Sequence, residues 1–147
     1  MRAARNGDLG AIVHLLESAD LPRDGVGLAL PDAVVAEADG VVVGAAALER
    51  HGADALLRSV VVDAAYRGRG IADALVADRL ARAAALGVRE VYLLTTTADG
   101  YFAQRAFLPI DRADVPAGIR RSPEFSTLCP ATAVVMRREL AAVDAIP

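Results

Sequence analysis

Hydrophobic residues recur along the chain with two different periods, and this predicts alternating helices and strands. Leu9, Ile12 and Leu16 are spaced as one face of a helix. Asp8 stands directly before them as a candidate N-cap. Residues 21–31 are rich in Gly and Pro and show no period, which predicts a loop or a short broken helix placed to border a site.

Three β-branched runs follow the first helix and predict strands. Two of them lie within residues 33–50 and flank Asp39-Gly40, a dipeptide that supplies positive φ in a two-residue hairpin turn. We therefore expect an antiparallel hairpin. The third run, residues 55–63, is almost continuously apolar, which indicates burial on both faces and a central place in the sheet.

A helix at residues 70–86 follows the third run, and Gly87 ends it as a left-handed cap. Residues 89–97 have high β-propensity and predict a strand. Run, turn, helix and strand form a βαβ unit, so we expect the two strands to be parallel with a right-handed crossover.

The rest of the chain predicts smaller elements. Residues 99–107 indicate a short helix, residues 111–130 a Pro-rich excursion, and residues 132–140 a late strand. The fold class is thus a single α/β domain with a mixed sheet flanked by helices. We expect it to occupy residues 1–140, with a frayed tail at 141–147.

Composition limits what such a domain can do. The net charge of -3 disfavours broad attraction to nucleic acid. The chain is 54% hydrophobic, yet no run approaches the about 20 apolar residues that span a bilayer. The N-terminus resembles the start of a fold rather than a leader, so a cytoplasmic location is expected. One cysteine, Cys129, with His14 and His51 cannot assemble a zinc-type cluster, and we expect no metal.

A basic, glycine-punctuated turn precedes the helix at 70–86 and predicts an anion site. Glycines before a helix let backbone N–H groups close around a phosphate. The triphosphate P-loop needs a lysine, and the chain has none. The dinucleotide fingerprint needs a third glycine where Asp73 stands, so dinucleotide binding is disfavoured.

The pattern Arg67-x-x-Gly70-x-Ala72 after a valine-rich strand resembles the coenzyme A turn of the Gcn5-related N-acetyltransferase (GNAT) superfamily. The resemblance covers essentially the whole chain, including a "YFAQRAF" segment similar to the family's "FYEKLGF" box. It implies the GNAT fold, with acetyl-CoA as cosubstrate.

Three further segments resemble a narrower group. "LLRSVVV", "VYLLTTT" and "EFSTLCPATAVVMRREL" look like the small acetyltransferases found with arsenic-resistance genes, which are similar to the acetyltransferase domain of acetylglutamate synthases. This implies a free amino acid or an amino-acid-like amine as acceptor, arsenical or phosphinic analogues included.

The superfamily resemblance also implies residue roles. The pantetheine would pair with the backbone of the central strand, and the Val62 amide would stabilise the oxyanion that forms on the thioester. The pyrophosphate would rest on the turn amides, with two arginines adding charge. The implied coenzyme contacts are Val60, Val61, Val62, Arg67, Gly68, Arg69, Gly70, Ile71, Ala72 and Asp73.

Direct attack by an amine needs a base and allows an acid. Glu49, near the end of its strand, is the candidate base acting through water; the alternative is an ordinary exposed carboxylate. The tyrosine that serves as the general acid in the family corresponds to Phe102, which follows Tyr101. Either Tyr101 reaches the sulfur, or the thiolate leaves unassisted. The second is preferred because adjacent helix positions point about 100° apart.

Arg58 is the candidate acceptor-binding residue. An arginine within so apolar a strand needs a partner, and we expect it on the same strand face as Val60. It either clamps a substrate carboxylate or forms a structural ion pair with Glu49 or Asp54. Cys129 as a covalent nucleophile is disfavoured, since it would need an activating histidine.

Two questions stay open from the sequence. The excursion at 112–127 either covers the acceptor site or forms a homodimer contact. The chain has two alternative functions besides that of a small-molecule acetyltransferase. One is a regulatory module that binds coenzyme A without turnover, which the missing tyrosine supports. The other is an acetyltransferase that acts on protein N-termini or lysines. An open channel would mark the last, and a closed pocket the first.

Overall fold

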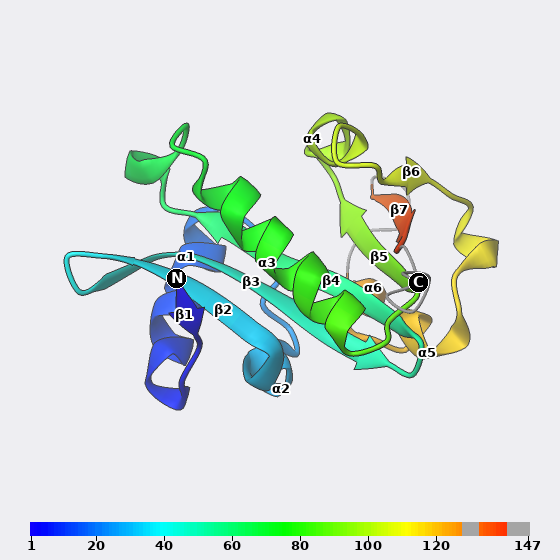
Figure 1. The fold of residues 1–147 in the computed structure, drawn as a ribbon, viewed down its shortest axis with the longest axis horizontal. Coiled ribbons are helices and arrows are strands. Elements are labelled where there is room, and N and C mark those ends of the chain that lie inside the picture. The colour runs from blue at the N-terminus through cyan, green and yellow to red at the C-terminus, as the bar shows by residue number, and fades with distance from the viewer. Residues whose placement is uncertain (128–132, 141–147) are drawn as a thin grey trace, which may run out of the picture.

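Seven strands form one mixed sheet, and helices cover both of its faces in the computed structural model, which describes residues 1–127 and 133–140 (Figure 1). The strands are β1 (Arg2–Ala3), β2 (Ala33–Ala38), β3 (Val41–His51), β4 (Asp54–Val62), β5 (Glu90–Thr95), β6 (Leu108–Pro109) and β7 (Val134–Glu139). The helices are α1 (Leu9–Ser18), α2 (Val26–Ala29), α3 (Ile71–Ala85), α4 (Asp99–Ala103), α5 (Ala117–Arg120) and α6 (Pro123–Thr127). The structure confirms the predicted fold class. The short strands β1 and β6 were not predicted from the sequence, and the predicted tail at 141–147 lies outside the described residues.

The sheet has the strand order β1-β2-β3-β4-β5-β7-β6, which puts β4 in the middle as predicted. The hairpin β2–β3 is confirmed, and its turn residues Asp39 and Gly40 have φ of 52° and 78°, as a two-residue turn with two positive φ values requires. β4 and β5 are parallel, as expected for a βαβ unit.

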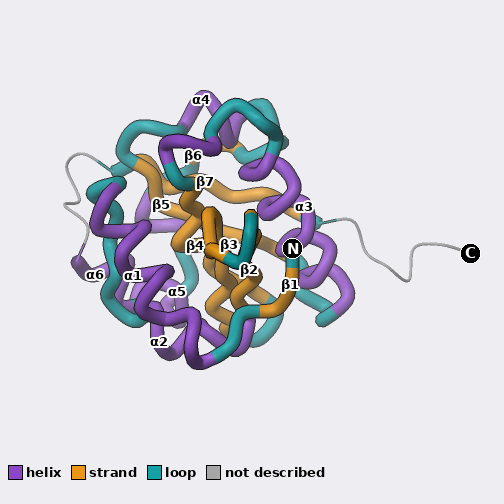
Figure 2. The backbone as a smooth tube through the Cα atoms, turned by 90° about the vertical axis from the view of Figure 1, so that its left-hand side faces the viewer, coloured by secondary structure: helices purple, strands orange, loops and turns teal. Residues whose placement is uncertain are grey.

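The two faces of the sheet carry different helices. α3 packs on one face, where Leu75, Val76 and Leu80 are buried. α1, α2, α5 and α6 lie on the opposite side, with the strands between the two layers (Figure 2). Gly44 of β3 lets α3 approach closely, because a Cβ there would lie 3.1 Å from Leu75 Cδ1 and 3.2 Å from the carbonyl oxygen of Val61.

The parallel strands β4 and β5 stay together over only part of their length. Their pairing covers three positions, from Asp54 with Glu90 to Leu56 with Tyr92. Beyond Leu56 the two strands diverge, as Figure 1 shows. The backbone of β4 after Leu56 therefore has an open side that faces away from β3.

A bulge in β4 changes which side chains face which layer. Ala47 of β3 pairs with Arg58 and Ala45 pairs with Val61, so one residue of β3 faces two of β4. Ser59 sits in this interval with a left-handed φ of 57°. The expectation that Arg58 and Val60 share a strand face was wrong. Val60 packs with the core beneath α3, whereas Arg58 lies on the face of α5 and α6, because the bulge offsets the alternation by one residue.

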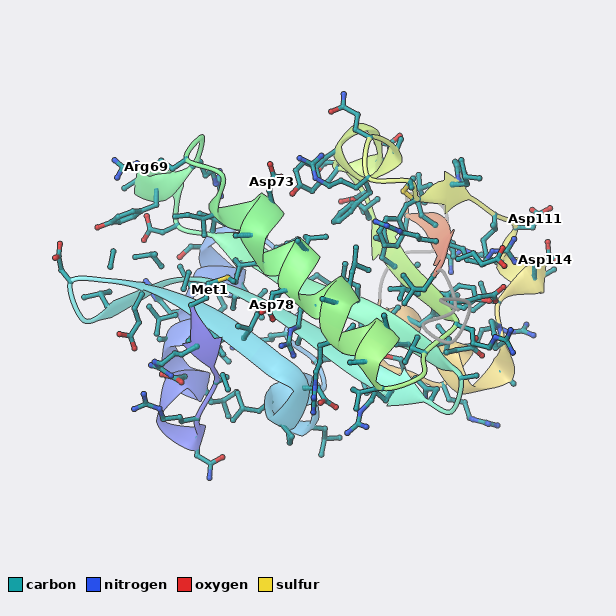
Figure 3. The ribbon with its side chains drawn as sticks, in the orientation of Figure 1. Met1, Arg69, Asp73, Asp78, Asp111 and Asp114 are labelled. Carbon is teal, nitrogen blue, oxygen red and sulfur yellow. The ribbon has the colours of Figure 1, made fainter. Side chains whose placement is uncertain are left out.

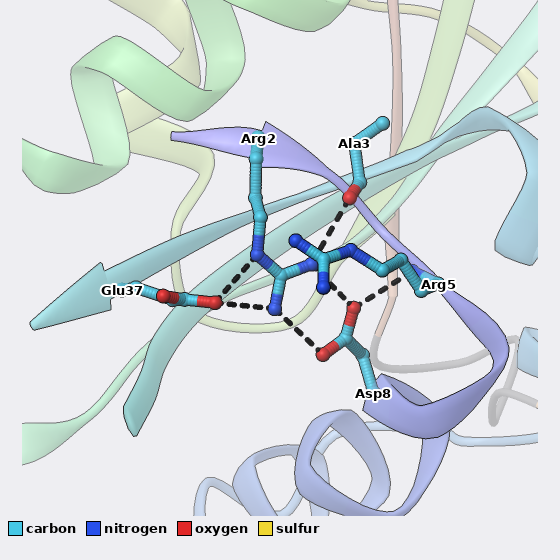
Figure 4. Close-up of polar contacts among 5 residues, drawn as sticks. All are labelled: Arg2, Ala3, Arg5, Asp8 and Glu37. Carbon is cyan, nitrogen blue, oxygen red and sulfur yellow. Dashed lines mark hydrogen bonds and ion pairs between the residues drawn. The ribbon is translucent and has the colours of Figure 1, made fainter. Parts of the chain in front are cut away.

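The N-terminal strand is held to the first helical turn by charge. Arg2 donates to both carboxylate oxygens of Asp8 at 2.7 and 2.9 Å and also pairs with Glu37, while the backbone N–H of Arg5 donates to Asp8 at 2.7 Å (Figure 4). The hydrogen bonds from Arg2 and from the Arg5 backbone lower the pKa of Asp8 to about 2.

We expect Asp8→Asn to lower stability at neutral pH. The depressed pKa means that Asp8 stabilises the fold at pH values above its ordinary pKa of 3.8, and that this contribution disappears as the pH falls toward 2. Thermal unfolding of the two proteins between pH 2 and 7 should show curves that converge at the acid end. A difference that stayed constant down to pH 2 would contradict this assignment.

Candidate active site

A cavity of about 440 Å³ lies where β4 and β5 separate. Residues 57–60 of β4 form one wall, residues 93–98 form the other, and Leu21 and Pro22 from the loop after α1 border it. The loop at 21–31 was expected to border a site, and its first two residues border this cavity. The lining residues are Ala19, Asp20, Leu21, Pro22, Leu57, Arg58, Ser59, Val60, Arg67, Leu93, Leu94, Thr95, Thr96, Thr97, Ala98, Phe102 and Glu124.

Arg58 is the centre of a buried charged cluster at this cavity. Its side chain is 0% exposed, and its Nη1 donates to Glu49 Oε2 at 2.7 Å. Its Nε lies 3.1 Å from Ser59 Oγ and 3.3 Å from Glu124 Oε2. Of the two alternatives for Arg58, the ion pair with Glu49 is therefore present. Its Nη2 has no hydrogen-bond partner among the described residues, so a substrate oxygen would complete its bonding.

Glu124 supplies the second carboxylate of the cluster. It comes from α6, is 5% exposed and lines the cavity. Burial raises the pKa of Glu124 to about 7; the nearby Arg58 guanidinium opposes this rise and the Glu49 carboxylate adds to it. Two carboxylates thus share one guanidinium in a mostly buried site. Burial and a neighbouring carboxylate both raise the pKa of a carboxyl group, here toward neutral pH.

Glu49 reaches the cluster from the other side. It lies beside Arg50 and His51 on a second cavity, which borders α2 and Pro123, and the cavity between β4 and β5 does not include it. Its carboxylate is engaged by Arg58 and by Ser122 Oγ at 3.0 Å, with His51 Nε2 3.5 Å away. A catalytic role for Glu49 stays a prediction.

The turn before α3 has the backbone form that an anion cradle needs. Gly68 and Gly70 both have φ of 78°, and a Cβ at either position would meet no atom within 4 Å. Gly70 is the residue directly before the first turn of α3. Figure 3 shows Arg69 in this turn and Asp73 on the first turn of the helix.

The two arginines of the turn are partly engaged. Arg67 lines the cavity, and its Nε donates to the carbonyl of Val62 at 3.2 Å. The Arg69 guanidinium lies over the ring of Tyr66, 5.0 Å from the ring centre. Both stay close to the turn, where each can add positive charge beside the helix N-terminus.

The end of β4 presents a backbone donor toward the open side. Asp63 donates its N–H to the Val43 carbonyl of β3 at 2.7 Å. Since successive residues of a strand direct their N–H groups to opposite sides, the N–H of Val62 points away from β3. This is the side on which β5 has diverged. The predicted coenzyme contacts Val60, Val61 and Val62 all belong to the stretch of β4 that no longer pairs with β5, although Val61 and Val62 still pair with β3.

Tyr101 links α4 to α3 rather than facing the cavity. Its hydroxyl donates to Asp73 Oδ1 at 2.7 Å, and Arg105 both covers its ring and pairs with Asp73. Hydrogen bonds from Tyr101 and Arg105 lower the pKa of Asp73. Burial and the bond to Asp73 raise the pKa of Tyr101 to about 12.

The contacts of Tyr101 affect whether its hydroxyl could protonate the thiolate leaving group. A phenol with a raised pKa is a weaker donor to a thiolate, whose own pKa is about 8.5. Phe102, at the position of the family's tyrosine, lines the cavity and has no proton to give. The geometry favours a thiolate that leaves unassisted, and Tyr101 as an acid stays a prediction.

Several residues of the site were not identified from the sequence. Ser59, Glu124 and the stretch 95–98 all line the cavity. Glu124 follows two arginines in the mostly polar stretch 120–127, so nothing in the sequence indicated that its carboxylate would be buried. The presence of Glu124 on the cavity wall favours the first alternative for residues 112–127, that of covering the acceptor site. Cys129 lies outside the described residues.

Across residues 1–127 and 133–140, no group of three or more His, Cys, Asp or Glu side chains is placed to hold a metal ion. None of the helices within those ranges is long and apolar enough to cross a membrane.

Known acetyltransferases resemble this chain in sequence. The sequence pattern of the acetyltransferase (GNAT) family matches residues 15–108. An amino-acid acetyltransferase of Aeromonas salmonicida is 30% identical over an alignment 131 residues long, which covers 82% of this chain. The chain spans only 29% of the length of that relative.

Solved structures share the fold. Rv2747 of Mycobacterium tuberculosis, in complex with CoA and NLQ, has a TM-score of 0.79 and 30% identity, and the match covers 95% of this chain and 98% of that one. N-acetylglutamate synthase of Neisseria gonorrhoeae, complexed with coenzyme A and N-acetyl-glutamate, has a TM-score of 0.81. At 21% identity, over 95% of this chain and 34% of the other, it shows the fold alone.

Proposed function

Because the chain belongs to the acetyltransferase (GNAT) family, we propose that it transfers the acetyl group of acetyl-CoA to the amine of a small amino acid or an amino-acid-like acceptor. The observation that carries this proposal is the cavity where β4 and β5 separate, with the buried Arg58 in its wall. The known activity of the Aeromonas salmonicida relative is consistent with it.

The residues present fit acetyl-CoA as a substrate. Between Val60 and Val62, the backbone groups that point away from β3 can bond to the pantetheine amides, and the turn at Gly68 to Asp73 offers amides and open space to the pyrophosphate. The N–H of Val62 is directed toward the open side, where it can stabilise negative charge on the thioester oxygen. Arg67 and Arg69 add positive charge near the phosphates.

An amino-acid acceptor fits the cavity wall. The buried Nη2 of Arg58 lacks a hydrogen-bond partner among the described residues, and a carboxylate, phosphinate or arsenate oxygen of the acceptor would satisfy it. Attack takes place directly, with acetyl-CoA and acceptor bound together. The single cysteine cannot serve a covalent route without an activating histidine.

The experiment is a thiol-release assay with acetyl-CoA over the free amino acids, their phosphonate, phosphinate and arsenical analogues, and short peptides. We expect release with at least one free amino acid or analogue and background rates with peptides. Turnover of peptides alone would favour a protein acetyltransferase. Coenzyme A binding without any turnover would favour the regulatory module, which Phe102 at the tyrosine position supports.

A further inference from the structure

Glu124 is the carboxylate best placed to handle the acceptor's proton, and we infer that it, rather than Glu49, is the base that deprotonates the ammonium group. The inference rests on the proposed acetyl transfer. Two carboxylates line the cavity between β4 and β5, Asp20 and Glu124. Asp20 is exposed, whereas Glu124 is 5% exposed and forms part of the buried wall. Glu49 does not line this cavity; it lines the second cavity, which borders α2 and Pro123.

The charges around Glu124 favour a cation. The Arg58 guanidinium contacts both Glu124 and Glu49, so two carboxylates share this one positive charge. An acceptor ammonium placed at the wall would balance the second carboxylate. The charged and titratable groups that face this part of the site are Arg58 of β4, Glu49 and His51 of β3, and Asp20 and Arg67 on the cavity rim.

The acid–base properties of Glu124 suit this role at neutral pH. Burial raises its pKa to about 7, Arg58 limits the rise and Glu49 increases it. A base is most effective when its pKa lies near the working pH, because it is then both available and strong enough. An ordinary exposed carboxylate with a pKa of about 4.3 would be a far weaker acceptor for a proton from an ammonium of pKa about 10.

The transfer balances with this single base. Glu124 takes one proton from R–NH3⁺, and the nitrogen lone pair then forms the C–N bond to the thioester carbonyl carbon. The C–S bond breaks, and its electron pair stays on sulfur. The second N–H proton goes to the thiolate, so the products are the N-acetylated acceptor, coenzyme A as the thiol, and one proton that Glu124 releases to water.

The test compares Glu124→Gln with the unaltered protein, using the acceptor that the thiol-release assay identifies. We expect kcat/KM at pH 7 to fall by about 100-fold or more, the usual contribution of a general base. In the unaltered protein kcat/KM should rise with pH through an apparent pKa near 7. In Glu124→Gln this rising limb of the pH profile should move toward about pH 10, where the amine loses its proton unaided. The kcat/KM values of the two proteins should therefore become similar at high pH.

A readout independent of turnover is the titration of glutamate carboxyl carbons by NMR. We expect one carboxyl signal that titrates near pH 7 and is absent from Glu124→Gln. Glu124→Asp, which keeps the charge but shortens the side chain, should retain the limb near pH 7 at a lower rate. Glu49→Gln is the matched variant for the other carboxylate of Arg58, and it should also keep that limb.

Three results would overturn the inference. The first is a Glu124→Gln protein, folded by its unfolding curve, that keeps both the rate and the limb near pH 7. The second is a limb that disappears in Glu49→Gln instead. The third is that every glutamate carboxyl titrates below about pH 5. Absence of turnover by the unaltered protein with every acceptor would overturn the proposed function and this inference together, which distinguishes that failure from the other three.

Discussion

Gly70→Val is expected to lose at least about 100-fold in coenzyme A affinity while the chain stays folded, which corresponds to about 2.7 kcal/mol of binding free energy. Gly70 has a φ of 78°, and a β-branched residue is strained by about 1–3 kcal/mol or more in this region. Relief of the strain turns the peptide groups on either side of position 70. The turn amides would then no longer converge on one pyrophosphate. Isothermal titration with coenzyme A measures the effect.

The control for this variant is Gly87→Val at the other end of the same helix. Gly87 has a φ of 83°, and a Cβ there would also meet nothing within 4 Å. Both variants carry the same kind of backbone strain and should lose similar stability in urea. Only Gly70→Val should lose coenzyme A affinity. If both variants bound coenzyme A as well as the unaltered protein, the pyrophosphate would have to lie elsewhere.

Arg58→Met should destabilise the protein by about 3–5 kcal/mol, the usual cost of leaving a buried charge without its partner. Methionine fills a similar volume but removes the guanidinium that both Glu49 and Glu124 contact. The loss should grow as the pH rises, because both carboxyl groups must ionise without compensation. Urea unfolding at pH 5 and pH 8 measures it.

Arg50→Met is the matched control for Arg58. Arg50 lies on β3 and pairs with Asp32 at 2.7 Å, but its side chain is 48% exposed. An exposed pair contributes about 0–1 kcal/mol, so this variant should unfold almost as the unaltered protein does. Adding Glu124→Gln to Arg58→Met should restore part of the lost stability, because one of the two facing charges is removed. Equal losses for both arginines would contradict the buried cluster.

Much of the fold could be predicted because local signals were strong. The pair Asp39-Gly40 fixed a hairpin, Gly87 marked the end of α3, and the apolar run at 55–63 indicated a central strand. β1 and β6 are two residues each, which is too short for a periodic pattern to emerge. They exist because neighbouring strands offer edges to pair with.

The site was harder to predict because it depends on contacts between distant segments. The turn proposed to bind the coenzyme is contiguous in sequence, so Gly68 and Gly70, which both have positive φ, could be picked out as candidates directly. The charged cluster joins Glu49, Arg58 and Glu124, and the last is 66 positions from Arg58 in the sequence. No spacing rule relates them. The depth at which Glu124 is buried comes from the packing of α6 on the sheet, and that packing moves its pKa.

The bulge at Ser59 also limits how the length of β4 can vary. Arg58 must face α6 and Val60 must face α3, and the extra residue between them makes both orientations possible. Deleting one residue here would restore a regular alternation and exchange the layers to which Val60, Val61 and Val62 belong. Related chains can therefore accept insertions in the excursion before β7 far more readily than a single-residue gap at this point of β4. An alignment that opens such a gap would misplace Arg58 relative to Val60, Val61 and Val62, the residues proposed for the acceptor and for the coenzyme.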